Sequence, residues 1–235
     1  MQLSTLFRKL SRAELSNLHM SNEGSGQIQT SAIPKLIGYT NDALISLFSR
    51  FRLAEKSVIV EMVAHITQYH LLPKYAESSE SNEQYHYIKD MLRDRFEGDV
   101  VKITEVFDSL GRRRVLNDVD NSLSLFTPTP ITLQVPLPIE GEALGVNYQA
   151  NHRVLRDEGE NLMGQQIDIP QVFERPLQAY VAYKVYSHMN GEEQKKIAME
   201  HFNTFNSICT QIEENDLANN TLSSSQDKLD MRGFV

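Results

Sequence analysis

Hydrophobic residues recur every three or four positions in three stretches of the chain, which is the period of one face of an α-helix. The first stretch is 34–51, and Pro34 suits a first helical turn because its missing N–H has no partner there. The other two are 174–188 and 192–216, separated by the helix-stop signal Asn190-Gly191. Because the link is so short, these two helices are predicted to form an antiparallel hairpin.

Between these stretches the apolar residues change to a two-residue period, which is typical of β-strands. Residues 56–64 are rich in β-branched side chains, and residues 99–107 alternate before a turn at Gly111. Residues 122–135 also alternate but contain two prolines, which cannot donate to a strand ladder. This pattern predicts an edge strand, or two strands around a bend.

Several shorter elements are predicted from segments with few periodic apolar residues. Residues 3–10 are expected to form a short helix that packs only when a partner covers it, and residues 85–96 a helix carrying Ile88, Met91 and Leu92. Further strands are expected at 65–72, 114–117 and 146–152.

The predicted fold class is α+β: a helical bundle or hairpin core with an inserted antiparallel β subdomain and an extended C-terminal tail. The predicted parts are an N-terminal helical part with short strands (1–98), an inserted β-rich subdomain (99–160), a C-terminal helical hairpin (161–216) and a flexible docking tail (217–235). The tail is rich in Asn, Ser, Thr and Asp, so it buries too little apolar surface to fold alone.

Composition narrows the class of partners. The chain has 235 residues, a formal net charge of −8 and a pI of about 5.4. An acidic chain favours protein partners over nucleic acid, whose binding depends on neutralising phosphates. The cluster Arg112, Arg113 and Arg114 is interpreted as a solvated hairpin turn and not as a nucleic-acid site. No apolar run of 18 residues and no secretory signal is seen, so a cytoplasmic product without a membrane span is expected.

Metal and cofactor sites are not predicted. His65 and His70 are five residues apart in a predicted strand, which places them on opposite faces, and His188 and His201 lack an evident third ligand. Cys209 is the only cysteine and lies in the apolar stripe of a helix, where it acts as a small hydrophobe.

Enzymatic motifs are also missing from the sequence. Gly24-Ser25-Gly26 lacks the lysine and flanking strand of a phosphate loop, and no Gly-x-Ser-x-Gly elbow occurs. The carboxylate pairs Glu192-Glu193 and Glu213-Glu214 flank helix ends, where a solvated face explains them. No catalytic residue, cofactor or metal is therefore predicted, and the chain is expected not to be an enzyme.

The last five residues, Met231 to Val235, combine apolar side chains with an arginine. Two interpretations remain open for them: an anchor for another chain, or a frayed end.

Three stretches carry a resemblance to a known family. Residues 14–53 read ELSNLHMSNEGSGQIQTSAIPKLIGYTNDALISLFSRFRL and are followed by EKSVIVEM. Residues 176–190 read PLQAYVAYKVYSHMN, and the chain closes with ICTQIEENDLANNTLSSSQDKLDMRGFV. Together they resemble the head-to-tail adaptor family of tailed phages, in N4-like podoviruses. The resemblance covers both ends of the chain and is weak in the β-rich middle.

The resemblance implies a structural virion protein at the head–tail interface, made in the host cytoplasm. It implies a homo-oligomeric ring, typically of twelve copies, that contacts the portal protein and a tail or nozzle protein. Genome DNA passes through such a ring without sequence-specific binding. It also implies that the tail docks on the portal through Arg232, Gly233, Phe234 and Val235. The alternatives are a tail-tube or nozzle subunit, or a cell-wall hydrolase.

Overall fold

The computed structural model describes residues 1–16, 18, 28–90 and 95–218. They form two compact units. A helical unit consists of Met1–Leu53 and the described chain from His152 onward, and a β unit consists of Ala54–Asn151. The predicted α+β class is confirmed. The predicted tail lies outside the described residues from residue 219 onward.

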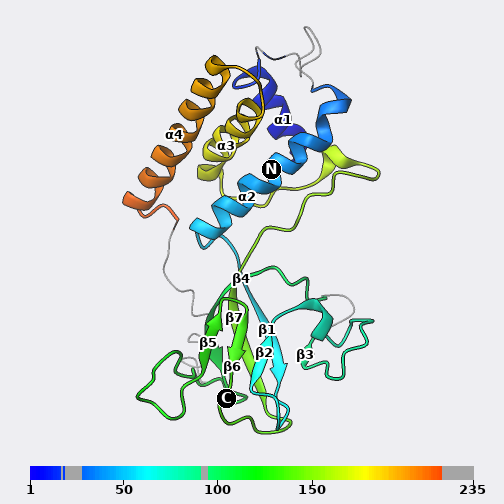
Figure 1. Ribbon diagram of the computed structural model, residues 1–235, viewed down its shortest axis with the longest axis vertical. Helices are drawn as coiled ribbons and strands as arrows, with labels where there is room; N and C mark the ends of the chain where they lie inside the picture. The colour runs from blue at the N-terminus through cyan, green and yellow to red at the C-terminus, as the bar shows by residue number, and fades with distance from the viewer. Residues whose placement is uncertain (17, 19–27, 91–94, 219–235) are drawn as a thin grey trace, which may run out of the picture. The chain divides into compact units, whose positions relative to one another are not determined.

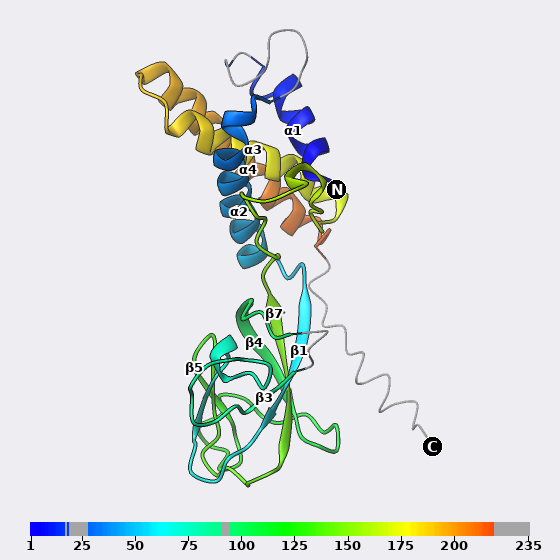
Figure 2. The same ribbon diagram turned by 90° about the vertical axis from the view of Figure 1, so that its right-hand side faces the viewer.

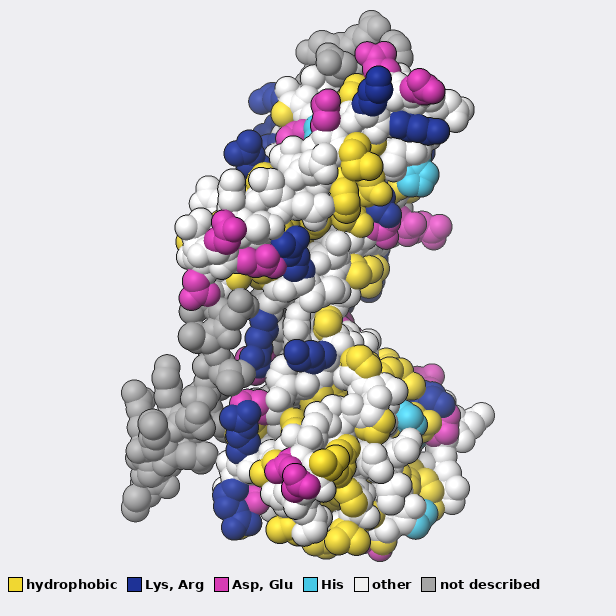
Figure 3. All heavy atoms as spheres, turned by 60° about the vertical axis from the view of Figure 1, so that its left-hand side comes forward, with side chains coloured by type: hydrophobic (Ala, Val, Ile, Leu, Met, Phe, Trp, Pro, Cys, Tyr) yellow, Lys and Arg dark blue, Asp and Glu magenta, His cyan; other side chains and the backbone are white. Residues whose placement is uncertain are grey.

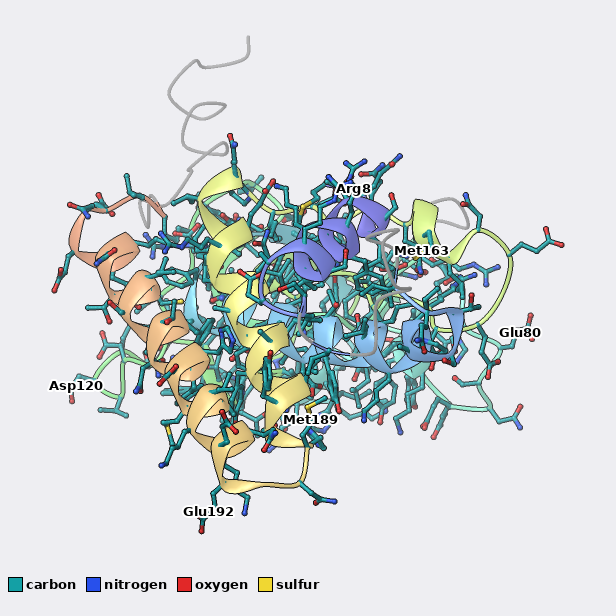
Figure 4. All side chains as sticks on the ribbon, turned by 90° about the horizontal axis from the view of Figure 1, so that it is seen from above. Arg8, Glu80, Asp120, Met163, Met189 and Glu192 are labelled. Atoms are coloured by element: carbon teal, nitrogen blue, oxygen red, sulfur yellow. The ribbon has the colours of Figure 1, made fainter. Side chains whose placement is uncertain are left out.

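The helical unit is built on four α-helices (Figure 1). Its α3–α4 hairpin is antiparallel, as predicted, and Met189 and Glu192 mark the turn between the two helices in Figure 4. Helix α3 packs along α4 and also contacts α2. The helices are α1 (Leu3–Arg12), α2 (Ile33–Arg50), α3 (Glu174–Ser187) and α4 (Glu192–Glu214), with 3-10 turns at Thr30–Ala32, Leu162–Gly164 and Gln171–Phe173.

Helix α1 is buried within its own unit, so the prediction that it packs only against a partner is wrong. Leu3, Leu6 and Leu10 are fully buried at helical spacing, with Phe7 beside them. The backbone N–H of Leu3 donates to the carbonyl of Gln165 at 2.9 Å. The cover therefore comes from a segment more than 150 residues away, which local periodicity does not reveal.

The centre of the helical unit joins α2 to the residues that follow the β unit. The rings of Phe51 and Phe173, both almost completely buried, meet edge to face with centroids 4.9 Å apart. Asn41 and Leu155 exchange two hydrogen bonds of 2.9 Å through the Asn41 side-chain amide. These contacts close the helical unit around both of its chain segments.

The β unit holds two antiparallel sheets (Figures 1 and 2). The larger has the order β3-β1-β7-β4 and the smaller the order β2-β6-β5. The strands are β1 (Glu55–Glu61), β2 (Gln68–His70), β3 (Ile88–Lys89), β4 (Val100–Phe107), β5 (Phe126–Thr129), β6 (Thr132–Gln134) and β7 (Ala143–Ala150), with a 3-10 turn at Pro73–Tyr75.

The chain enters and leaves the β unit on neighbouring strands. Strands β1 and β7 pair along their whole length, from Glu55 opposite Gln149 to Glu61 opposite Ala143. Residues 54–98 thus contribute three strands to this unit, and its limits differ from the predicted insertion at 99–160. The reason is that β1 pairs with residues about 90 positions later, and such pairing leaves no trace in local periodicity.

Residues 85–90 are extended, so the predicted helix over 85–96 is wrong at its first half. Ile88 and Tyr87 are buried in the β core, and Ile88 pairs with Val60 of β1. A short run with three apolar residues fits either period, and the available sheet edge decides the outcome. Met91 and Leu92 lie outside the described residues.

Residues 122–135, which contain two prolines, form two strands around a bend, and this was one of the two predicted alternatives. Strands β5 and β6 form a hairpin, and β5, which contains Pro128, lies at the edge of its sheet. The strand predicted at 114–117 is reduced to single bridges, of Arg113 with Phe107 and of Leu116 with Leu125.

Candidate interaction surfaces

An open groove runs along the helical unit between α2, α3 and α4, with a volume of about 830 Å³. Hydrophobic side chains gather on this unit in the space-filling view of Figure 3. We call this feature the helical groove. Its lining comprises Asp42, Ile45, Ser46, Ser49, Arg50, Tyr180, Tyr183, Lys184, Phe202, Phe205 and Asn206.

The floor of the helical groove is aromatic. Tyr180 and Tyr183 project from α3 three residues apart, and Phe202 and Phe205 project from α4 with the same spacing. Tyr180 meets Phe205 with ring centroids 5.0 Å apart, and Tyr183 meets Phe202 at 4.9 Å. Phe205 is buried, whereas the other three rings stay partly exposed. Aromatic rings with one open face are typical of surfaces that bind another polypeptide.

Ion pairs border this aromatic floor. Lys184 lies 2.9 Å from the carboxylate of Asp42, and this hydrogen bond raises the pKa of the lysine. Arg50 contacts the carboxylate of Glu213 on α4. Asp42 and Arg50 are eight residues apart on α2, about 12 Å along the helix axis. Between them the side chain of Ile45 is 48% exposed, so the groove is apolar in its middle and charged at its borders.

The β unit carries its own apolar surface on its loops. Leu123, Leu137 and Ile139 are 66%, 74% and 62% exposed, and all three line a hollow of about 580 Å³. We call these three residues the loop surface. Large apolar side chains that gather at such exposure mark interaction sites on soluble proteins.

The three arginines that follow Gly111 are engaged in local contacts. Arg112 pairs with Asp108 at 2.9 Å, Arg113 with Glu105 at 3.2 Å, and Arg114 donates to the carbonyl of Leu123 at 3.2 Å. Gly111, in the turn, has a φ of +76°, which favours glycine. The predicted hairpin turn is therefore confirmed.

Asp108 organises this turn. Burial alone would raise the pKa of its carboxyl group, but hydrogen bonds from the backbone N–H groups of Arg112 and Leu110 and from the Arg112 side chain lower it. The carboxylate therefore stays ionised and holds the turn that precedes Leu123.

The four histidines that were considered as metal ligands each contact a different residue. His65 bonds the hydroxyl of Tyr85 at 2.8 Å, and His70 bonds the Thr132 hydroxyl at 3.0 Å. The rings of His188 and His201 stack on Tyr39 and Tyr186, respectively. In the part of the chain that the structure describes, no three His, Cys, Asp or Glu side chains converge as metal ligands would.

Cys209 is fully buried on α4, as the apolar stripe predicted. Burial raises the pKa of its thiol to about 11; the charge of Arg50 lowers this pKa slightly, and the charge of Glu213 raises it slightly. The thiol is therefore protonated at neutral pH and packs as a small hydrophobe.

The groove and the loop surface were not predicted from the sequence. The paired aromatics of α3 and α4 are a signal for the groove, since two aromatic pairs at i and i+3 exceed what a hairpin core needs. Leu137 and Ile139, set among two prolines and two glutamates, are a weaker signal. The predicted anchor residues Arg232, Gly233, Phe234 and Val235 lie outside the described residues.

Among the described helices, none combines the length and apolar character that crossing a bilayer demands. Comparison of the sequence with protein-family models and with curated proteins gives no match.

Proposed function

We propose that the chain is an adaptor subunit that joins the portal to the tail of a podovirus-like particle. One structural observation carries the proposal: each of the two units presents a docking surface of its own. The helical unit has the helical groove, and the β unit has the loop surface. A protein that connects two different partners needs two such surfaces, and the resemblance at both chain ends agrees with this role.

In this proposal copies of the chain close into a ring. Such a ring forms when unlike faces of neighbouring copies contact each other and the rotation from each copy to the next adds up to a full turn. The resemblance gives twelve copies as the expected number. A net charge of −8 suits the lining of a channel that lets genome DNA pass without sequence-specific binding.

The portal contact in this proposal is the anchor Arg232, Gly233, Phe234 and Val235. A single short anchor binds weakly, because ordering a polar tail costs conformational entropy. A ring tethers many anchors at once, and this multiplicity converts a weak contact into a durable joint.

A second candidate function is a tail-tube or nozzle subunit. The loop surface favours it, since exposed leucines on β-unit loops suit stacking on other tail proteins. This candidate needs no portal contact, and that difference separates the two.

Native mass measurements of the purified full chain test the proposal, first alone and then mixed with the portal or with the tail protein of the same virus. A stoichiometric ring on the portal is the expected result. A complex with the tail protein alone would favour the nozzle subunit. If neither mixture forms a complex, the adaptor proposal fails.

Deletion of residues 219–235 tests the anchor separately. The shortened chain should keep its circular dichroism spectrum but lose the portal complex. Retained portal binding would refute the anchor and leave the adaptor role standing.

A further inference from the structure

We infer that the helical groove binds residues 229–235 of the same chain. This inference goes beyond the proposed function and concerns the free chain: the contact forms without the portal, and the segment would leave the groove when it docks there. Four observations carry it: the chemistry of the groove, the residue pattern of the segment, the charges at the groove border and the length of the connecting chain.

The groove calls for an apolar segment with charged neighbours. Its middle consists of partly exposed Tyr183 and Phe202 with Ile45 on the α2 side, and its charges lie at the borders. Covering these rings removes apolar surface from water, which is the main favourable contribution to association. A volume of about 830 Å³ admits a few side chains of an extended peptide and not a folded domain.

The segment 229–235 reads LDMRGFV and has the matching pattern. In an extended conformation alternate side chains share a face, so Asp230, Arg232 and Phe234 would be spaced about 7 Å apart on one side. That face presents a negative charge, a positive charge and an aromatic ring in order.

The groove border presents the complementary charges. Lys184 and Asp42 form a pair across α3 and α2, and the Asp42 side chain is 47% exposed. Placed over this pair, Asp230 faces Lys184 and Arg232 faces Asp42. Phe234 then reaches the aromatic floor about 7 Å further along the groove, over Tyr183 and Phe202. Opposite charges that face each other fix the register of such a bound segment more than they raise its affinity.

The connection is long enough for binding within one molecule. The last turns of α4 lie at the groove, where Thr210 and Glu213 contact Arg50. Residues 219–229 span up to about 36 Å when extended, against about 12 Å between Asp42 and Arg50 on α2. A tether of this length holds the segment at an effective concentration of about millimolar, which favours it over another copy.

The chain contains no tryptophan, so the fluorescence of a single introduced tryptophan reports on this contact. In the full-length Phe234→Trp variant, the indole should emit at shorter wavelength and resist acrylamide quenching. A Leu222→Trp variant, in the same tail but outside the segment, serves as the reference for a solvated indole. Equal emission and equal quenching of the two variants would overturn the inference.

Groove substitutions in the Phe234→Trp background locate the contact. Ile45→Asp should shift the emission to longer wavelength, and Met199→Asp should not, although Met199 is also an exposed apolar residue of the helical unit. Because both positions are exposed, neither change is expected to unfold the unit. If both variants shift the emission alike, or if neither does, the groove is not the binding site.

Charge reversal tests the register. Asp42→Arg alone and Arg232→Asp alone should each release the indole, and the double variant should restore its burial. Failure of the double variant to restore it would overturn the assigned pairing. Burial that vanishes on dilution would show that another copy supplies the segment and would overturn binding within one molecule. The native mass of the portal mixture is measured separately, so failure of the proposed function is seen independently.

Discussion

The guanidinium of Arg50 donates two hydrogen bonds of 2.7 Å to the carboxylate of Glu213, one from Nε and one from Nη2. Arg50 is the last residue of α2, and Glu213 lies in the last turn of α4. The hydrogen bond to Glu213 raises the pKa of Arg50, and the same contact lowers the pKa of Glu213. This two-point contact therefore fixes the end of α2 against the end of the hairpin.

Replacing Glu213 by Gln should lower the melting temperature of the chain at low salt. The decrease should shrink in 1 M salt, because exposed charge pairs are screened. Differential scanning calorimetry at the two salt concentrations measures it. Glu214→Gln, at the neighbouring position, is the control and should have little effect at either concentration.

Two glycines should respond to alanine in opposite ways. Gly98 has a φ of +72°, and a Cβ there would lie 2.6 Å from Cδ of Pro73. Gly98→Ala should therefore destabilise the β unit by more than about 1 kcal/mol. Gly38 lies in α2 with no atom within 4 Å of an added Cβ, so Gly38→Ala should stabilise the helical unit by about 0.5–1 kcal/mol. Urea unfolding measures both, and a mild effect at Gly98 would contradict the geometry.

His152 should make stability fall in weak acid. Burial lowers the pKa of its imidazole, partly opposed by a backbone hydrogen bond to Arg153 and by Asp168. Its Nε2 accepts the backbone N–H of Asp168 at 3.0 Å, which only the neutral ring does. The folded chain thus binds fewer protons than the unfolded chain, so the stabilisation is complete above pH 6.5 and is lost as the pH falls below it.

Urea midpoints measured from pH 7.5 to pH 4.5 check this prediction. In a His152→Gln variant the decline should be shallower, whatever the loss at neutral pH. His201, whose pKa is also lowered by burial, contributes in the same direction and should be compared as His201→Gln. An unchanged pH slope in the His152 variant would contradict the assignment.

Leu137→Asp should weaken binding to the tail partner of the proposed adaptor by about tenfold or more, since burying a carboxylate in an apolar contact costs at least about 1.4 kcal/mol. Stability should hardly change, because the side chain is 74% exposed. Val154→Asp, at a similarly exposed apolar position of the helical unit, is the control. Titration followed by native mass spectrometry measures both, and equal losses would rule out a specific role of the loop surface.

The helices could be predicted where the apolar residues of the sequence recur with the helical period and the same residues are buried. The α3–α4 hairpin and α2 match their predicted ranges within a few residues, because each buries one long apolar face. Where cover comes from a distant segment the predictions failed. Leu3 of α1 bonds Gln165, and Ile88 joins a strand edge instead of a helix.

The candidate surfaces were less predictable than the fold. Cys209 and the Arg112 turn were placed correctly, since both depend on local pattern. The groove depends on three helices meeting, and only the coordinates bring Ile45 beside Tyr183. A residue of the floor and a residue of the core have the same apolar signature until their exposure is known.

The pairing of β1 with β7 has a consequence for synthesis on the ribosome. Both strands lie within Ala54–Asn151, so the β unit has all its strands as soon as Asn151 has left the exit tunnel. Helix α2 is made earlier, yet Phe51 must wait for Phe173 before its ring is covered. Because domains fold as units during translation, the nascent chain should complete its middle first and its two ends last.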